Sequence, residues 1–238
     1  MNYEPRLQAS ADSAPRTKRH SALVRIAHWL VVASVLGLFI SGAGILISHP
    51  RLYWGETGAV GAPSLVDLPL PFIIGPSVWN RPIHFLFAWM LVLPGVIYVI
   101  AGLVTPHFRK DLLPKSADLK WRRISDTISA HLRWKRTPDD ESWTYNVVQR
   151  ITYLGVIFAL FPAIVWTGLA MSPALMSVFP FMVTVLGGHQ SARTLHFVFV
   201  VLLLLFVIVH IAMLVLVGFA NHTRAMITGR IPEEGTAP

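Results

Sequence analysis

The sequence of 238 residues contains no cysteine. This absence excludes disulfide bridges, thiolate-bound iron–sulfur clusters and covalently attached c-type haem, which needs a C-x-x-C-H segment. Any redox cofactor must therefore be held non-covalently. Among the residue types that remain, histidine is the leading candidate ligand for such a cofactor.

Charge is also scarce, because charged residues make up only 13% of the sequence and hydrophobic residues make up 54%. This balance is too apolar for an ordinary soluble domain. Four runs lack Asp, Glu, Lys and Arg altogether, and each is long enough to cross a hydrocarbon core of about 30 Å. These runs are residues 26–48, 83–104, 151–171 and 194–219. The sequence therefore predicts an integral membrane protein.

We expect an all-α fold, an integral membrane four-helix bundle of up-down topology. Its transmembrane helices are predicted at about 24–48, 82–104, 147–171 and 192–219. Residues 1–20 are predicted to be a disordered N-terminal tail, 21–225 the transmembrane domain and 226–238 a C-terminal tail. The first apolar run is too long for a signal-peptide core, so we expect it to be retained.

The basic residues are unevenly distributed between the two sides of the predicted bundle. Seventeen of the twenty Lys and Arg residues fall on the side of the termini and the 105–146 loop, and three fall on the other side. Those three are Arg51, Arg81 and Arg193. The positive-inside rule then places both termini in the cytoplasm, in a multi-pass protein of the bacterial inner (cytoplasmic) membrane. The net charge of +8 reports this topology rather than nucleic-acid binding.

The cytoplasmic loop contains an apolar pattern at helical spacing. Leu119 or Trp121 is followed by Ile124, Ile128 and Leu132, with Lys and Arg on the other faces. This pattern predicts an amphipathic helix that lies on anionic lipid headgroups. The alternative interpretation is a solvated linker.

Four of the ten histidines lie inside the predicted spans: His28, His84, His196 and His210. His196 and His210 are fourteen residues apart, which is about 21 Å along a helix and nearly four full turns, so both face the same side. Because alternate helices run in opposite directions, His84 shares the periplasmic depth of His196. His28 shares the cytoplasmic depth of His210.

Two opposed imidazoles at each of two depths, in apolar spans, are typical of bis-histidine haem b. Zinc or copper sites usually recruit a further ligand, and no span contains a carboxylate to supply one. We therefore expect two haem b groups, whose iron ligands are the pairs His84–His196 and His28–His210. For each histidine taken alone, the alternative is a hydrogen-bonded core residue.

Three of these histidines follow an arginine by three residues, in RIAH, RPIH and RTLH. At this spacing Arg25, Arg81 and Arg193 lie on the same helix face as their histidines, where a guanidinium suits the carboxylate geometry of a haem propionate. The alternative is that each arginine is an interfacial anchor.

Small residues at haem depth form a further pattern. Gly42 stands fourteen residues after His28, so we expect it to face the periplasmic haem and to let the flat macrocycle approach the backbone. Thr167 and Gly168 form a similar small spot in the third helix. Ordinary helix packing in membranes also uses small residues and remains the alternative.

With these features the chain resembles the bacterial di-haem cytochrome b subunits of formate dehydrogenase-N, nickel–iron hydrogenase and thiosulfate-reductase-type enzymes. The resemblance covers residues 20–225. It is most specific in the fourteen-residue histidine spacing and in YNVVQRITY at 145–153. It implies a respiratory electron-transfer subunit without catalytic residues. Electrons would pass between a periplasmic molybdoenzyme, iron–sulfur protein or hydrogenase and the quinone pool, menaquinone or ubiquinone.

The resemblance also implies that Asn146 helps to bind quinone beside the cytoplasmic-side haem, with Gln149 as a weaker candidate. The alternative is that Asn146 caps the third helix, and both roles are compatible. The long first periplasmic loop, with its YWGETG segment, departs from the formate dehydrogenase pattern. This departure favours a thiosulfate-reductase-like or molybdoenzyme partner.

Two other functions compete with this interpretation. The chain could be a stand-alone quinone-linked oxidoreductase that acts on a small diffusible species such as superoxide. It could also be a metal transporter with histidine sites, although its spans lack the carboxylates and the discontinuous helices that are common in transporters.

Overall fold

The computed structural model describes residues 21–58, 61–69, 78–105, 108, 112–114, 119–135 and 146–230. The predicted tail at residues 1–20 lies outside the described residues, as do residues 231–238. Four helical spans are long and apolar enough to cross a membrane, which confirms the predicted membrane bundle. They are α1 (Ala22–Ser48), α2 (Asn80–Val104), the continuous stretch α5 (Val147–Gly155), η2 (Val156–Leu160) and α6 (Phe161–Ala170), and α9 (His189–Val217).

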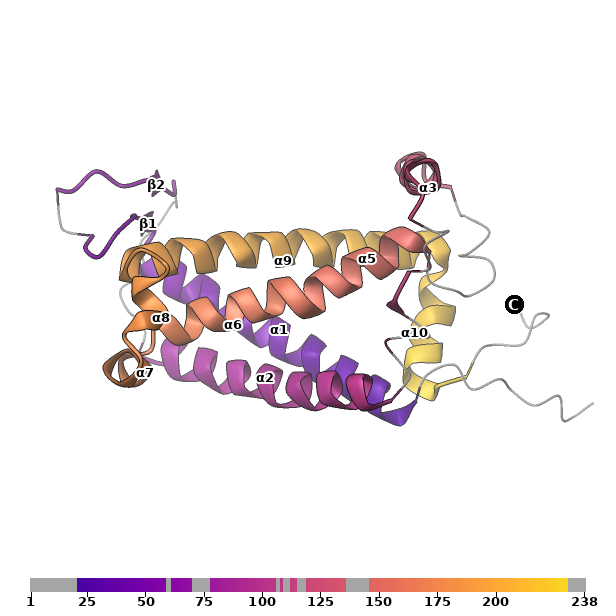
Figure 1. The fold of residues 1–238 in the computed structure, drawn as a ribbon, viewed down its shortest axis with the longest axis horizontal. Helices are drawn as coiled ribbons and strands as arrows, with labels where there is room; N and C mark the ends of the chain where they lie inside the picture. Colours follow the sequence, from indigo (N-terminus) through magenta and orange to yellow (C-terminus); the bar gives the residue numbers. More distant parts are fainter. Residues whose placement is uncertain are drawn as a thin grey trace, which may run out of the picture.

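The spans run side by side, and short elements mark the two ends of the bundle (Figure 1). At one end, here called the strand end, lie β1 (Arg51–Leu52), β2 (Val66–Asp67), α7 (Pro173–Val178) and α8 (Phe181–Thr184). At the other, the α10 end, lies α10 (Phe219–Thr228). Arg25 near the start of α1 donates a hydrogen bond to the Ile227 carbonyl of α10. The first and last described segments therefore meet at the same end, as four crossings require.

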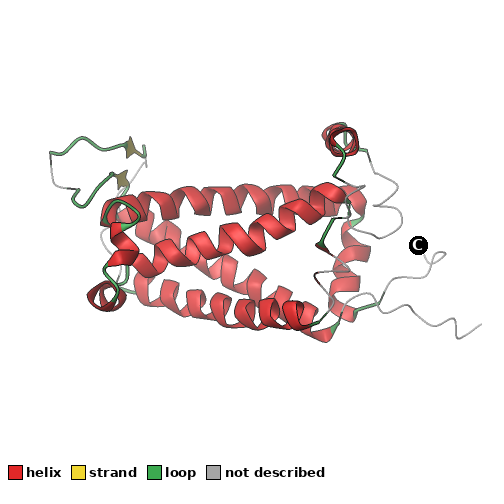
Figure 2. Cartoon of the chain, in the orientation of Figure 1, coloured by secondary structure: helices red, strands yellow, loops and turns green. Residues whose placement is uncertain are grey.

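Close backbone packing is concentrated in two helix pairs, α1 with α2 and α6 with α9. Small residues allow this approach: the Phe87 ring of α2 packs so close to Gly37 of α1 that a Cβ there would overlap it. Membrane helices commonly have small residues at such interfaces, because small side chains let the two backbones approach closely. The bundle is thus built from two packed helix pairs. Figure 2 shows that most of the described chain is helical.

The outer surface of the spans is strongly apolar. Large side chains such as Ile40 and Val104 are 76% and 82% exposed. An apolar surface of this extent is unfavourable in water but is the ordinary surface of a helix in lipid. The exposure pattern therefore agrees with a multi-pass membrane protein.

Helix α9 begins under a segment of the first loop. Its N-cap, Gly188, offers no side chain, and the Gly55 carbonyl instead accepts from the N–H groups of Gln190 (3.0 Å) and Ser191 (3.3 Å). The Ser191 hydroxyl in turn accepts from the Gly55 N–H at 2.7 Å, and Thr194 donates to the Tyr53 carbonyl at 2.6 Å. The loop thereby satisfies N–H groups that every helix leaves unpaired at its start.

Two further helical features follow from particular residues. The π-helical turn η2 precedes Pro162, and the Phe161 N–H donates to the Val156 carbonyl five residues earlier. Gly218, with φ of +123°, separates α9 from α10. Helix α10 was not predicted, because its polar composition resembles that of a tail.

The amphipathic helix predicted in the loop between the second and third spans is confirmed as α3 (Trp121–Leu132). It lies beside the start of α5 at the α10 end (Figure 1). Trp121 and Leu132 are 78% and 83% exposed, so the apolar face of α3 is only partly covered by the bundle. Its position on lipid headgroups stays a prediction.

We predict that Gly188→Ala destabilises the protein by about 1–3 kcal/mol, because its backbone conformation is one that essentially only glycine adopts. Its φ is +113°, and an added Cβ would lie 2.5 Å from the Gly55 carbonyl oxygen. Thermal unfolding in detergent measures the change. Gly95→Ala is the matched control, since nothing lies within 4 Å of a Cβ there. Equal melting temperatures for the two variants would contradict the role of the loop.

Candidate functional site

The structure brings together two of the four histidines singled out from the sequence. The rings of His84, from α2, and His196, from α9, have their centres 6.3 Å apart, with an interplanar angle of 69°. The two residues come from different helix pairs, and both lie toward the strand end. The pair His84–His196, predicted from depth alone, is therefore a real contact across the bundle.

The ring separation fits two ligands of one metal ion. An imidazole nitrogen binds a first-row metal at about 2 Å, and the ring centre lies about 1 Å behind that nitrogen, so opposed ligand rings have centres roughly 6 Å apart. The observed separation of 6.3 Å agrees with this value. The separation is therefore compatible with one metal ion bound by both rings.

Hydroxyl groups hold the other nitrogen of each ring. The Ser41 Oγ lies 3.0 Å from His84 Nδ1, and the Thr167 Oγ1 lies 3.0 Å from His196 Nδ1. The Ile164 carbonyl, 3.1 Å from His196 Nδ1, can only accept, so that nitrogen carries the proton. The neutral ring then has its lone pair on Nε2, the atom available to a metal.

Glycines lie directly beside both rings. A Cβ at Gly42 of α1 would lie 3.4 Å from the Cε1 atom of His84, and a Cβ at Gly168 of α6 would lie at the same distance from the Cε1 atom of His196. A longer side chain at either position would reach into the space around the ring. The structure thus places the predicted Gly42 beside one ring of the pair and Gly168 beside the other.

The second predicted pair, His28 and His210, lies toward the α10 end. His28 of α1 is close enough to His210 of α9 for the two rings to interact electrostatically. Aromatic side chains surround them: Phe206 stacks on His210 with centres 5.7 Å apart, and Tyr153 and Trp29 make edge contacts with His210 and His28 at 6.3 Å and 5.5 Å. This pair therefore lies in an aromatic environment.

Two of the predicted arginines, Arg81 and Arg193, lie near the strand-end starts of α2 and α9. Arg193 donates to the His49 carbonyl and lies within electrostatic range of Arg81. Two guanidinium groups at close range repel each other unless an anion lies near both. The arrangement therefore suits an anionic group such as a propionate, the role predicted from the sequence.

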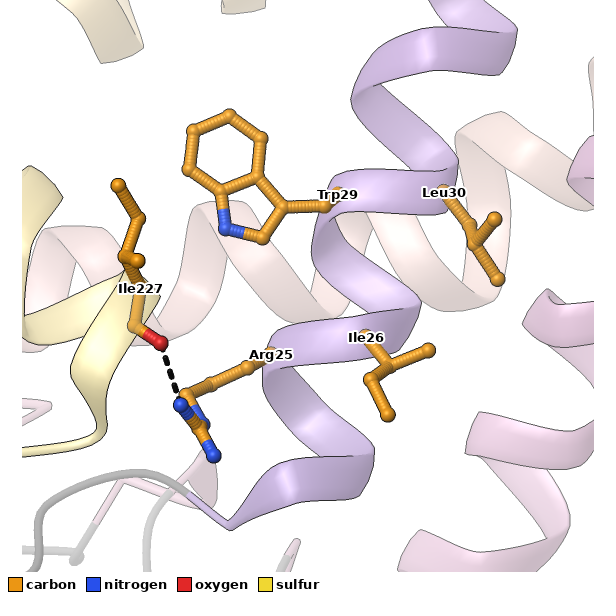
Figure 3. A pocket seen from close by; sticks show the side chains of 5 residues that line it. All are labelled: Arg25, Ile26, Trp29, Leu30 and Ile227. Carbon is orange, nitrogen blue, oxygen red and sulfur yellow. Dashed lines mark hydrogen bonds between the residues drawn. The ribbon is translucent and has the colours of Figure 1, made fainter.

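Arg25 is placed differently, at the mouth of a pocket of about 400 Å³ that is also lined by Ile26, Trp29, Leu30 and Ile227. Figure 3 shows its guanidinium directed toward α10, where it bonds to the Ile227 carbonyl. Its Nε atom is buried and has no hydrogen-bond partner among the described residues. A contact between Arg25 and a propionate stays a prediction.

Asn146 and Gln149 form a capping box at the start of α5. The Asn146 Oδ1 accepts from the Gln149 N–H at 2.9 Å, and the Gln149 Oε1 accepts from the Asn146 N–H at 3.2 Å. Asn146 is only 1% exposed. The cap proposed as one role of Asn146 is therefore present, and the quinone contact of both residues stays a prediction.

The donor set suits haem better than a bare metal ion. Over the described ranges, no group of three or more His, Asp or Glu residues could enclose a metal ion. A metal held by only two imidazoles needs its other ligands from elsewhere, and the four nitrogens of a macrocycle supply them. The ring spacing, the free Nε2 atoms and the adjacent glycines together fit a haem.

Comparison with known proteins agrees with this geometry. The model of the family described as prokaryotic cytochrome b561 matches residues 19–229. The chain belongs to the prokaryotic cytochrome b561 family. A relative, the putative protein-methionine-sulfoxide reductase subunit YedZ1 of Azospira oryzae, is 31% identical over 198 residues, which cover 83% of this chain and 90% of the relative. No solved structure matches the chain.

Membership of this cytochrome b561 family confirms the resemblance drawn from the sequence and implies haem b as cofactor. The hydroxyl contacts of Ser41 and Thr167 were not predicted from the sequence. A signal was nevertheless present, because each hydroxyl residue directly precedes a glycine, in Ser41–Gly42 and Thr167–Gly168. Two such dipeptides in apolar spans mark the helix faces that the histidines contact.

We predict that Gly42→Leu and Gly168→Leu each lower the haem content of the purified cytochrome. Overpacking costs about 1–3 kcal/mol, which is roughly five- to 150-fold in affinity. The haem-to-protein ratio measures the loss, and Gly95→Leu, at a position with nothing within 4 Å of a Cβ, is the control. Full haem content in both variants would show that the two glycines serve ordinary helix packing and not haem binding.

Proposed function

We propose that this cytochrome is a membrane-anchored di-haem subunit that carries electrons between a redox partner at the strand end and quinone at the α10 end. The observation that carries the proposal is the opposed pair His84–His196, with His28 and His210 near each other at the opposite end of the same bundle. His84 and His196 would hold one haem b, and His28 and His210 the second.

Haem iron takes up and releases one electron at a time, and two such groups at different depths provide a path across the bilayer. The chain's own residues supply the binding and the environment. The histidines provide Nε2 lone pairs, the glycines leave room for a flat ring, and the Arg81–Arg193 group offers positive charge to propionates at the strand end.

Charge distribution supports an orientation with the α10 end in the cytoplasm of a bacterial inner membrane. Seventeen of the twenty Lys and Arg residues belong to the termini and loops of that side. The positive-inside rule relates such a bias to cytoplasmic exposure. The strand end, with the loop that covers the start of α9, would then face the periplasm and the partner.

The relative YedZ1 is named as a subunit of a protein-methionine-sulfoxide reductase, which favours a subunit role over a stand-alone enzyme. We infer that the partner is a periplasmic reductase of the molybdoenzyme class and that electrons flow from quinol toward it. A stand-alone superoxide-oxidising enzyme would act without such a partner. A transporter role has no support in the site, because the described histidines form pairs rather than larger clusters.

The quinone site is proposed at the α10 end, near Asn146 and the His28–His210 pair. A quinone carbonyl needs a hydrogen-bond donor, and an amide side chain supplies one without placing a charge in the membrane. In the Asn146 side chain the oxygen accepts in the capping box, and the amide nitrogen is the only atom that can donate to a carbonyl. Menaquinone and ubiquinone both present such carbonyls.

We predict that His84→Ala and His196→Ala remove the same haem, and that His28→Ala and His210→Ala both remove the other. Each substitution removes one of the two imidazoles that would hold a haem, so one component should disappear from a potentiometric optical titration while the other remains. His49→Ala, an exposed histidine outside both pairs, is the control and should retain both components. Loss of different components in His84→Ala and His196→Ala would show that the pairing is wrong.

We predict that Asn146→Ser slows quinol oxidation while leaving the fold intact, because serine can still cap α5 but lacks the amide donor. Losing one such contact costs about 1–3 kcal/mol, which is roughly five- to 150-fold in quinol affinity. Quinol kinetics and thermal unfolding, measured together, separate the two roles. Asn146→Leu should both slow quinol oxidation and lower the melting temperature. Normal quinol kinetics in Asn146→Ser would leave Asn146 with the capping role alone.

A further inference from the structure

Two helices of this cytochrome carry the same short frame. Residues 38–42 of α1 read LFISG, and residues 164–168 of α6 read IVWTG. Each frame has a branched apolar residue, then a hydroxyl residue three positions later, then glycine. The frames belong to different helix pairs, and each one contacts the histidine of its own pair, His84 or His196.

The hydrogen bonds of the two frames correspond one to one. Ser41 Oγ lies 2.7 Å from the Gly37 carbonyl four residues earlier, and Thr167 Oγ1 lies 2.8 Å from the Ala163 carbonyl four residues earlier. A hydroxyl has one proton, and in each frame this short bond to a carbonyl uses it. The hydroxyl oxygen is then left to accept from the imidazole Nδ1–H.

The carbonyl of the first residue in each frame also faces its histidine. Ile164 accepts from His196 Nδ1 at 3.1 Å, and the Leu38 carbonyl interacts with the His84 ring. Ser41 and Thr167 are 3% and 1% exposed, so water does not compete for these contacts. Hydrogen bonds are electrostatically stronger in such low-dielectric surroundings than in water.

We propose that Ser41 and Thr167 are positioning residues that set the reduction potential and the ring orientation of the His84–His196 haem site. The proposal rests on the proposed function, in which these histidines bind haem iron. Each hydroxyl shares the Nδ1 proton of its ring with the carbonyl of its frame, which leaves the ring's lone pair on Nε2. Accepting the Nδ1 proton also makes Nε2 a more basic ligand.

A more basic ligand pair stabilises the oxidised, more positive iron and lowers the potential of its haem. The hydroxyls also limit rotation of the rings, whose planes lie at 69° to each other. The electron paramagnetic resonance spectrum of low-spin ferric haem depends on this angle. Within the part of the chain that the structure describes, His28 and His210 show no comparable hydroxyl partner, so the α10-end haem serves as an internal reference.

The test measures midpoint potentials and electron paramagnetic resonance spectra of the purified, haem-loaded cytochrome. The variants are Ser41→Ala and Thr167→Val, which remove the hydroxyls, and Ser41→Thr and Thr167→Ser, which keep them. Ser34→Ala is the matched control, because Ser34 is also fully buried on α1 and donates to the carbonyl four residues earlier, Leu30, at 2.7 Å. No histidine contact is seen for Ser34 among the described residues.

In Ser41→Ala and Thr167→Val we expect the midpoint potential of the strand-end haem to rise. The rise should be at most about 59 mV, which is a tenfold change in the equilibrium constant for its one-electron reduction. Its resonance at lowest field should also move. The α10-end haem, Ser34→Ala and the two hydroxyl-retaining variants should stay at wild-type values. If a hydroxyl-free variant loses the strand-end haem entirely, the hydroxyl-retaining variant should restore it.

Unchanged potentials and spectra in both hydroxyl-free variants, with haem still bound, would overturn the proposal while leaving the proposed function intact. An equal shift in Ser34→Ala would also overturn it, since the effect would then follow any lost buried hydroxyl. The proposed function would instead fail if His84→Ala and His196→Ala kept every haem component of the wild-type protein.

Discussion

The structure depends on one constraint: an imidazole inside an apolar bundle must have both of its nitrogens satisfied. At His84 and His196 the chain supplies a partner for Nδ1 through a buried hydroxyl, and the two ring centres lie 6.3 Å apart. A ring nitrogen with a lone pair and no protein donor is costly in hydrocarbon, and a bound metal ion removes that cost. A ligand role would therefore explain how the fold accommodates these histidines.

Packing follows from this constraint. If all four spans packed equally closely, no space would remain for a macrocycle, and the chain instead concentrates close contacts within two helix pairs. Gly37 lets α1 approach α2 closely, whereas Gly42, five residues further along α1, leaves room beside the His84 ring. At the strand end, the loop around Gly55 caps the start of α9, and Arg193 in the first turns of α9 bonds to the His49 carbonyl.

The sequence was sufficient to predict the spans, the α3 helix and the His84–His196 pair. Those features depend on local apolar runs and on helix geometry, which fix the depth and the face of each residue. The hydroxyl partners and the loop over α9 were not predictable in the same way, because they join residues far apart in sequence: Ser41 with His84, and Gly55 with Ser191. The position of Arg25 likewise depends on α10, a helix whose polar composition gave no apolar signal.

The central claim is that one chain binds two haem b groups through two histidine pairs at different depths. A pyridine haemochrome assay on the purified chain in detergent, combined with amino-acid analysis for protein concentration, tests it most directly. We expect two haem b per chain, both low-spin because two imidazoles would bind each iron. One haem per chain would leave one of the histidine pairs without a cofactor, and none would contradict the haem assignment altogether.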